Sequence, residues 1–275
     1  MIASTFKDPA LENQIDRQGY VYIPGFYSAF DIKEMLALYR SVHSRKKDPD
    51  SGQWNSLIHM DPALSKEVSE KILELLRPKL NLLLNDTYTP VATFLSKYPG
   101  ERSWCDMHRD FSILDESKFE YRNIWIPLID IDEQNGALFV LPGSHKIFRE
   151  ELPMTQPWMY MQHSPALMKY VKTFYTKAGD LIVYKDKLVH GSHLNNTDDT
   201  RPVIHLGTLP EEARTCFYYL HGKEVEVYNV EPDYFFKNDL GEPPVNGKPF
   251  RTFPYTYPEY TTREIEKLVT ENMPQ

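Results

Sequence analysis

The amino-acid sequence predicts an α+β protein with a mainly β core and flanking helices near its N-terminus. Apolar residues in helical spacing are concentrated before position 87. From position 88 onward, short β-branched and aromatic runs alternate with Gly, Pro and Asn turns, which favours a sandwich or a barrel. The chain also contains 18 Tyr, 14 Phe and 21 Pro, which suggests a β-rich core wrapped by long irregular segments.

One domain is expected to span residues 1–275. This length suffices for one large domain or two small ones, and no linker divides the chain. The expected organisation has a helical part over about 1–87, a β core over about 88–220 and a C-terminal extension over about 221–275. The role of the extension stays open, with substrate selection among the possibilities.

Composition and charge argue against several classes of protein. Hydrophobic residues make up 41% and charged residues 25% of the chain, as in ordinary soluble proteins. The net charge of −8 disfavours a nucleic-acid partner, whose binding surface would be a basic stripe. There is no run of 18 apolar residues, and residues 1–8 lack a signal-peptide core, so no membrane span is expected. We therefore expect a cytoplasmic protein with Cys105 and Cys216 as free thiols, while the oligomeric state stays open.

The N-terminal third combines helices with one early strand. The expected elements are a helix over 10–18, a strand over 19–26, a helix over 29–42, an exposed loop over 44–56 and a helix over 65–85. Ser28 followed by Asp31 resembles a capping box, in which two side chains satisfy free backbone N–H groups. A last amphipathic helix is expected over 261–271, begun by Thr261 or Thr262.

The β core is expected to contain many short strands. The candidate strands cover 91–97, 104–110, 122–128, 137–141, 180–184, 188–190, 203–208 and 215–220. The segment 146–178 between them is expected to be partly helical and to form a lid or an insertion beside the core.

A candidate metal site begins with His108 and Asp110. On a strand, residues i and i+2 project to the same face, so an imidazole and a carboxylate can reach one point. His190 is the natural third ligand, and two His with one carboxylate leave open positions that suit a non-haem Fe(II) oxygenase. Cys105 has an odd offset from His108, which predicts that it points to the other face of the strand.

A carboxylate clamp is expected beside this metal. A tight turn at Asn195 and Asn196 would bring Arg201 across from His190 on a neighbouring strand, since Asn tolerates left-handed backbone geometry. The guanidinium of Arg201 presents a planar fork of donors to a carboxylate. Ser192 shares a face with His190 and would add a hydrogen bond to the same carboxylate.

Three other residues are judged by strand parity and context. His193 is expected to face away from His190, on the surface or in a turn. Arg109 faces opposite His108 and is expected to be solvated. His205 shares the strand parity of Arg201, so it either lines the pocket or is a satisfied core histidine.

These motifs together resemble the phytanoyl-CoA dioxygenase family over roughly residues 10–210. The opening Asp16-Arg17-Gln18-Gly19-Tyr20-Val21, followed by Pro24-Gly25-Phe26, also resembles that family. The other motifs that carry the resemblance are His108-x-Asp110, the run Asn135-Gly136-Ala137-Leu138-Phe139-Val140-Leu141-Pro142-Gly143-Ser144-His145, Gly179-Asp180, His190-x-Ser192 and Arg201. The resemblance implies a double-stranded β-helix (jelly-roll, cupin-like) core that uses Fe(II), 2-oxoglutarate and O2.

The resemblance also implies roles for individual residues. The implied iron ligands, which are also the catalytic residues, are His108, Asp110 and His190. The implied cosubstrate-binding residues are Arg201 and Ser192 at the distal carboxylate of 2-oxoglutarate, together with Trp125 and Lys97. The family's halogenating relatives carry a small residue in place of the carboxylate ligand, so Asp110 argues for hydroxylation.

The expected function is therefore hydroxylation of a small organic substrate with release of succinate and CO2. An amino-acid-like or natural-product molecule is the first candidate substrate and a CoA thioester the second. A zinc hydrolase also uses two His and one carboxylate, but it usually brings a nearby general base, and the chain has no HExxH motif. A non-catalytic jelly-roll binding protein would not need Arg201 and three intact ligands together.

Overall fold

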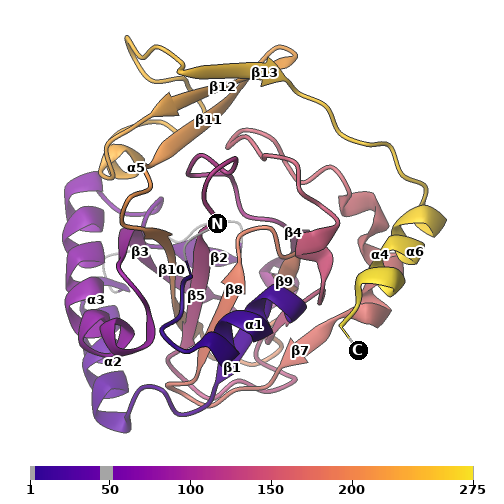
Figure 1. The fold of residues 1–275 in the computed structure, drawn as a ribbon. Coiled ribbons are helices and arrows are strands. Elements are labelled where there is room, and N and C mark those ends of the chain that lie inside the picture. The colour runs from indigo at the N-terminus through magenta and orange to yellow at the C-terminus, as the bar shows by residue number, and fades with distance from the viewer. Residues whose placement is uncertain (1–3, 44–51, 275) are drawn as a thin grey trace.

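Two antiparallel β-sheets face each other at the centre of the protein, whose computed structural model describes residues 4–43 and 52–274 (Figure 1). The larger sheet has six strands in the order β1 (Tyr20–Ile23), β8 (Leu181–Lys185), β5 (Arg122–Pro127), β10 (Arg201–Pro210), β3 (Thr87–Lys97) and β2 (Gln53–Asn55). The smaller sheet has four strands in the order β4 (Cys105–His108), β9 (His190–Ser192), β6 (Leu138–Val140) and β7 (Lys172–Phe174). The chain passes back and forth between the sheets, which confirms the predicted double-stranded β-helix within an α+β fold.

Helices cover the outer face of the six-stranded sheet (Figure 1). α2 (Ala29–His43) and α3 (Pro62–Leu83) lie over the sheet, and α1 (Pro9–Gln18) packs beside β1. α3 begins three residues before its predicted start at Ser65, because the Asp61 carboxylate accepts hydrogen bonds from the first backbone N–H groups and Pro62 follows it.

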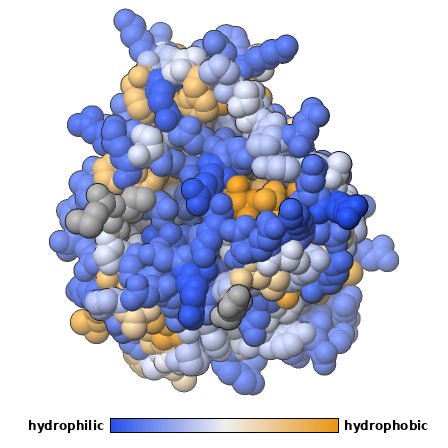
Figure 2. Space-filling view, turned by 45° about the vertical axis from the view of Figure 1, so that its right-hand side comes forward, coloured by the Kyte–Doolittle hydropathy of each residue, from blue (hydrophilic) through white to orange (hydrophobic). Residues whose placement is uncertain are grey.

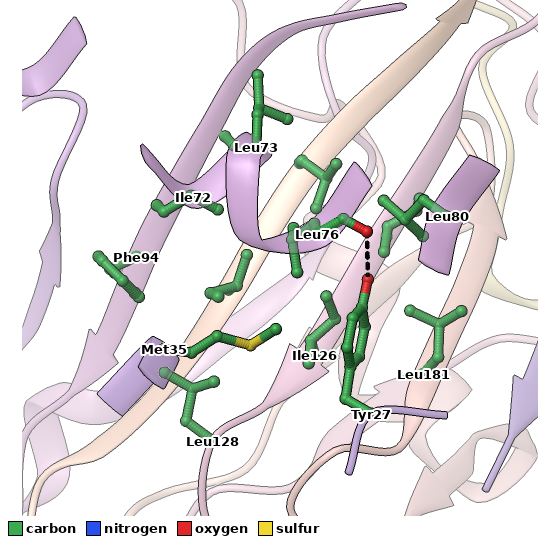
Figure 3. Packing of buried hydrophobic residues seen from close by; sticks show 14 of the residues in the cluster. Tyr27, Met35, Ile72, Leu73, Leu76, Leu80, Phe94, Ile126, Leu128 and Leu181 are labelled. Atoms are coloured by element: carbon green, nitrogen blue, oxygen red, sulfur yellow. Dashed lines mark hydrogen bonds between the residues drawn. The ribbon is translucent and has the colours of Figure 1, made fainter. Parts of the chain in front are cut away.

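Strand alternation divides the side chains of the six-stranded sheet between two cores. One set packs against α2 and α3, where Met35 and Leu76 are fully buried beside Ile126 (Figure 3). The Tyr27 hydroxyl closes this layer by donating to the backbone oxygen of Leu76 at 3.3 Å. The intervening residues point toward the smaller sheet, because successive side chains of a strand project to opposite faces. This inner set forms the wall on which the candidate site residues lie.

The outer face of the smaller sheet is covered by distant segments of the chain. Phe139 and Val189 of this sheet region pack with Phe148 and Trp158 from the segment 146–170, and with Ile265 of α6 (Thr262–Asn272). α6 begins with the predicted capping box, in which Thr261 and Glu264 exchange hydrogen bonds. The partly helical segment after residue 146 contains α4 (Ser164–Leu167) and is a cover for this sheet, so it lies outside the space between the sheets.

The rest of the C-terminal extension forms a small separate sheet. β11 (Cys216–His221), β12 (Glu224–Asn229) and β13 (Arg251–Pro254) pair in order at the top of Figure 1, next to the short helix α5 (Tyr234–Lys237). The predicted strand over 215–220 corresponds to β11, but it was expected in the β core and belongs to this separate sheet. An extended connection then leads from β13 at the top to α6 at the right-hand side of Figure 1.

Several predicted boundaries differ from the structure, and three of these differences concern strands that line the candidate site. The predicted loop 44–56 ends in strand β2, whose Trp54 is fully buried in the core, whereas residues 44–51 lie outside the described residues. Strand β4 ends at His108, so Asp110 follows the strand and does not belong to it. Strand β9 begins at His190, where the predicted strand ended. Strands of three or four residues are too short for a reliable periodic signal.

The surface is dominated by polar side chains on the side shown in Figure 2, where the most strongly hydrophobic area is small and lies near the middle, with paler hydrophobic areas near the top and toward the lower left. Within residues 4–43 and 52–274, no helix combines the length and the apolar character needed to cross a membrane.

Candidate active site

Three side chains converge at one end of the space between the sheets. Ligand atoms of His108, Asp110 and His190 lie within 4.8 Å of one another. His108 and His190 are direct partners in the β4–β9 pair, which places both imidazoles side by side. Asp110 reaches the same point from the segment after β4. The predicted grouping is confirmed, although a strand supplies only one of the two residues in the His-x-Asp motif.

Backbone carbonyls orient both imidazole rings for metal binding. Nδ1 of His108 lies 2.8 Å from the Asp106 oxygen, and Nδ1 of His190 lies 3.0 Å from the Leu188 oxygen. A carbonyl only accepts, so each Nδ1 carries a proton and each Nε2 is left to face a metal. Burial lowers the pKa of His108, but the charges of Cys105 and Asp110 outweigh it and raise the pKa to about 10, so this ring gives up its Nε2 proton when a metal binds. Burial also lowers the pKa of His190 to about 4, which keeps this ring neutral at pH 7. Neutral imidazole is the form that binds metal.

The carboxylate of Asp110 is held from the opposite sheet. The side-chain amide of Asn123, on β5, donates to Asp110 Oδ2 at 2.7 Å. The same oxygen lies 3.7 Å from His190 Nε2. One oxygen is thereby anchored while the carboxylate stays beside the two imidazoles. Such outer partners orient metal ligands and tune their affinity.

Two buried cations mark the other end of the cavity. Lys97 of β3 and Arg201 of β10 are direct strand partners, and their exposed fractions are only 2% and 4%. Arg201 donates from Nη2 to the Gly136 oxygen at 2.9 Å, while its buried Nε has no hydrogen-bond partner. Burial lowers the pKa of Arg201 only to about 10, so the guanidinium stays charged at pH 7. Within the described residues no carboxylate pairs with Arg201, which leaves a buried charge suited to an anionic ligand.

Lys97 uses its ammonium differently from Arg201. Its Nζ donates to the backbone oxygens of Ser103, Ser192 and His193, the last at 2.6 Å. An ammonium has three donors, so these carbonyls occupy all of them. Burial, followed by the nearby Arg201 charge, lowers the pKa of Lys97 to about 7. These contacts favour a role in fixing the end of β9, while direct contact with a cosubstrate stays a prediction.

A cavity of about 220 Å³ connects the cation end with the metal-binding end. Its lining includes all seven predicted site residues, namely Lys97, His108, Asp110, Trp125, His190, Ser192 and Arg201. The Arg201 guanidinium carbon lies 5.7 Å from the centre of the Trp125 ring, so this aromatic side chain forms part of the wall near Arg201.

Further lining residues escaped the sequence analysis. Gln53, Asn55 and Leu95 form part of the wall, the first two from the strand that was predicted as a loop. The alternation of polar Gln53 and Asn55 around a buried Trp54 is the pattern of an inward-facing strand, but three residues are too few to separate it from a polar loop.

The position of Cys105 corrects its predicted orientation. The pairing of β4 with β9 shifts register between Cys105 and His108, which is the signature of a β-bulge. The bulge reverses the parity, and the thiol lines the cavity with its Sγ 3.9 Å from His108 Nδ1. Both cysteines are free, as predicted.

The predicted hairpin that would place Arg201 beside His190 is wrong. β9 belongs to the smaller sheet and β10 to the larger one, so the segment between them crosses from one sheet to the other. Asn195 stabilises this crossing without a left-handed backbone: its amide donates to the oxygens of Lys97 and Asp199. His190 and Arg201 therefore approach the cavity from facing sheets.

The positions of His205, His193 and Arg109 agree to different degrees with the predictions from strand parity. His205 lines the cavity, and its Nε2 lies 3.1 Å from the Tyr184 hydroxyl. His193 packs near Phe139 and contacts Thr173, on the outer side of the smaller sheet. Arg109 is not solvated as predicted: it is 2% exposed and donates to the backbone oxygens of Phe148 and Glu150, which tie the 146–170 segment to the core.

Two imidazoles and one carboxylate that converge on one point, inside a double-stranded β-helix with a buried arginine, define the class of Fe(II)- and 2-oxoglutarate-dependent oxygenases. A model of the family described as Phytanoyl-CoA dioxygenase (PhyH) matches residues 15–203. The chain belongs to this family, and the resemblance seen in the sequence is confirmed.

Curated relatives match over part of their length. A protein named Phytanoyl-CoA dioxygenase 1 from Oryza sativa subsp. japonica is 28% identical over 128 residues, which is 44% of this chain and 44% of the relative. A protein named Dioxygenase FUM3 from Gibberella moniliformis is 33% identical over 79 residues, which is 29% of this chain and 22% of the relative. The chain thus matches less than half the length of these relatives.

Solved structures share the fold at low sequence identity. The epimerase SnoN in complex with Fe3+, alpha ketoglutarate and nogalamycin RO has a TM-score of 0.58 at 20% identity and covers 91% of this chain and 97% of its own. HygX from Streptomyces hygroscopicus with nickel and 2-oxoglutarate has a TM-score of 0.53 at 15% identity, covering 74% and 88%. Iron and 2-oxoglutarate are therefore bound within this fold by structural neighbours.

Proposed function

We propose that this protein hydroxylates an unactivated C–H bond of a small organic molecule. The coupled reaction converts substrate, 2-oxoglutarate and O2 into hydroxylated product, succinate and CO2. The observation that carries this proposal is one cavity with three metal-donor side chains at one end and, at the other, a buried guanidinium whose Nε has no partner among the described residues. Asp110 supplies the carboxylate ligand, which leaves no position for a halide in its place.

The residues present fit iron and 2-oxoglutarate. His108, Asp110 and His190 would hold Fe(II), which when bound supplies the redox chemistry that joins O2 to the cosubstrate. Arg201 would grip the distal carboxylate of 2-oxoglutarate through the guanidinium edge that carries its unpaired Nε, and Ser192 would assist. Trp125 would flank the carbon chain, and the buried walls would exclude water from the reacting atoms.

The cavity favours a small substrate. About 220 Å³ has to accommodate both the cosubstrate and the reacting part of the substrate. Structural neighbours were crystallised with nogalamycin RO, hygromycin B and 5-hydroxyectoine. We propose an amino-acid-like or natural-product molecule, with a CoA thioester as the second candidate. We further propose that residues 1–275 act as one domain in the cytoplasm, a proposal supported by helices from both ends packing on the sheets and by two free thiols.

The test measures succinate formation by purified protein with Fe(II), 2-oxoglutarate and O2, with and without candidate substrates. We expect slow succinate release without substrate, acceleration by the true substrate, and a product that gains one oxygen atom. Protein loaded with Zn(II) is the control and should release none. Substrate hydrolysis by the Zn(II) protein, without succinate from the Fe(II) protein, would overturn the proposal in favour of a hydrolase.

Cosubstrate binding should stabilise the fold. With Co(II) in place of Fe(II), we expect 2-oxoglutarate at 100 times its Kd to raise the free energy of unfolding by about 2.7 kcal/mol. Glutarate reaches the Arg201 clamp but lacks the keto acid that chelates a metal, so its effect should be smaller and independent of Co(II). The measurement is thermal unfolding with each acid. Equal stabilisation by both acids would contradict chelation at the metal.

Asn123→Leu should weaken metal binding without removing a ligand. The substitution keeps the shape of the side chain but frees Asp110 Oδ2 from its 2.7 Å hydrogen bond. Loss of an outer partner typically lowers metal affinity by about 10- to 100-fold. Calorimetric titration with Co(II) checks this value. Asn238→Leu, at an exposed position, is the matched control, and an unchanged Kd for Asn123→Leu would remove Asn123 from the site.

A further inference from the structure

The Tyr184 hydroxyl lies beside the metal-binding atoms but has no place in the proposed function. Its oxygen is 3.4 Å from His190 Nε2 and 3.1 Å from His205 Nε2. Tyr184 is 1% exposed, so bulk water does not reach the hydroxyl. A metal bound by His190 takes the lone pair of Nε2 and removes that acceptor. The Tyr184 O–H group then needs another partner.

His205 is placed to donate to Tyr184. The Nδ1 atoms of His108 and His190 each face a backbone oxygen, whereas no described residue accepts a hydrogen bond from Nδ1 of His205. We assign the proton of neutral His205 to Nε2, where the Tyr184 oxygen accepts it. With its oxygen accepting from His205, Tyr184 directs its own O–H into the cavity.

The group that accepts the hydrogen bond from the Tyr184 hydroxyl can be located along strand β10. His205 and Arg201 lie on the same face of this strand, four residues apart, which corresponds to about 13 Å. The arginine side chain and the 2-oxoglutarate held at its end together span this interval toward the metal. Its keto acid end then lies at the level of His205 and Tyr184. No carboxylate of the protein other than Asp110 lines this part of the cavity in the described residues.

We propose that Tyr184, oriented by His205, donates a hydrogen bond to the keto acid end of 2-oxoglutarate and positions it at the metal. This inference rests on the proposed function, since it assumes that the cosubstrate binds between the metal ligands and Arg201. Tyr184 contacts the cosubstrate in this arrangement, and His205 acts through Tyr184 as a positioning residue.

The test compares 2-oxoglutarate with glutarate, which has no keto acid. Binding is measured by calorimetry on the Co(II)-loaded protein for wild type and for Tyr184→Phe, which keeps the buried ring. We expect the 2-oxoglutarate Kd to rise on the order of tenfold to a hundredfold, as for a lost hydrogen bond to a charged group, and the glutarate Kd to change less than about twofold. The visible absorbance of the anaerobic Fe(II)–2-oxoglutarate complex should shift in the same variant.

Tyr20→Phe is the matched control, because Tyr20 is the direct strand partner of Tyr184 and packs in the same core cluster. It should leave both Kd values and the absorbance unchanged. His205→Leu should reproduce the selective loss, and the double variant Tyr184→Phe/His205→Leu should lose little more than either single variant. His205→Gln retains an N–H donor and should restore part of the affinity. These variants also keep the test decisive if Tyr184→Phe folds poorly.

Three outcomes separate this inference from the proposed function. If wild-type protein binds 2-oxoglutarate and releases succinate while Tyr184→Phe has wild-type affinity and absorbance, the inference is overturned and the proposed function stands. Equal losses for 2-oxoglutarate and glutarate would show that Tyr184 only supports the fold, which also overturns it. If wild-type protein neither binds 2-oxoglutarate nor releases succinate, the proposed function fails and the inference fails with it.

Discussion

His190→Ala is expected to abolish Fe(II)-dependent succinate formation while the protein stays folded. His190 supplies one of three ligand atoms, and no other His, Cys, Asp or Glu among the described residues joins this group. Loss of an outer partner alone lowers metal affinity by about 10- to 100-fold, so loss of a ligand should exceed about a hundredfold. The measurement is succinate release over a series of Fe(II) concentrations, together with circular dichroism to verify the fold.

His193→Ala is the matched control for this prediction. His193 follows β9 and is half-buried, but its ring contacts Thr173 and Phe139 on the far side of the smaller sheet. We expect it to retain most succinate formation. Wild-type activity in His190→Ala would move the metal site elsewhere, and equal loss in both variants would indicate general damage to the fold.

The metal site was predictable because its ligands form a local pattern. His108 and Asp110 need only an extended backbone between them to reach one point, and this requirement holds although β4 ends at His108. The inward face of β5 was equally regular: Asn123 and Trp125 alternate with Ile124 and Ile126, which pack under the helices. Alternation of this kind can be read from sequence when a strand is long enough.

The predictions were wrong for residues whose positions depend on pairing between distant segments of the chain. The bulge that turns Cys105 into the cavity depends on the register of β4 against β9, and no feature of residues 104–110 indicates this register. The connection after Ser192 resembles a hairpin turn in composition, but both of its flanking strands find partners elsewhere. Arg109 has the parity of a solvated residue, yet the segment 146–170 folds over it. Local propensity could not predict these long-range contacts.

Arg201→Met should change stability in opposite directions with and without the cosubstrate. In the free protein, Arg201 is a buried cation beside Lys97, with its Nε unsatisfied. Replacing buried charges by apolar residues of similar volume is often neutral or stabilising by about 1–4 kcal/mol, although the Gly136 oxygen loses its donor here. We therefore expect the midpoint of urea unfolding to stay equal or rise in the variant without 2-oxoglutarate.

The same variant should lose the stabilisation by 2-oxoglutarate. Removing one partner of a buried ion pair costs about 3–5 kcal/mol, which corresponds to more than a hundredfold in Kd. Arg201→Lys keeps the charge but loses the planar fork, so its loss should be intermediate, on the order of 2 kcal/mol. Arg17→Lys, at an exposed position, is the control and should behave as wild type. Urea unfolding of each variant with and without 2-oxoglutarate checks the order wild type, Lys, Met. A stabilisation by 2-oxoglutarate that persists in Arg201→Met would place the carboxylate clamp on another residue, and Lys97 would then be the next cation to test, because it lines the same end of the cavity.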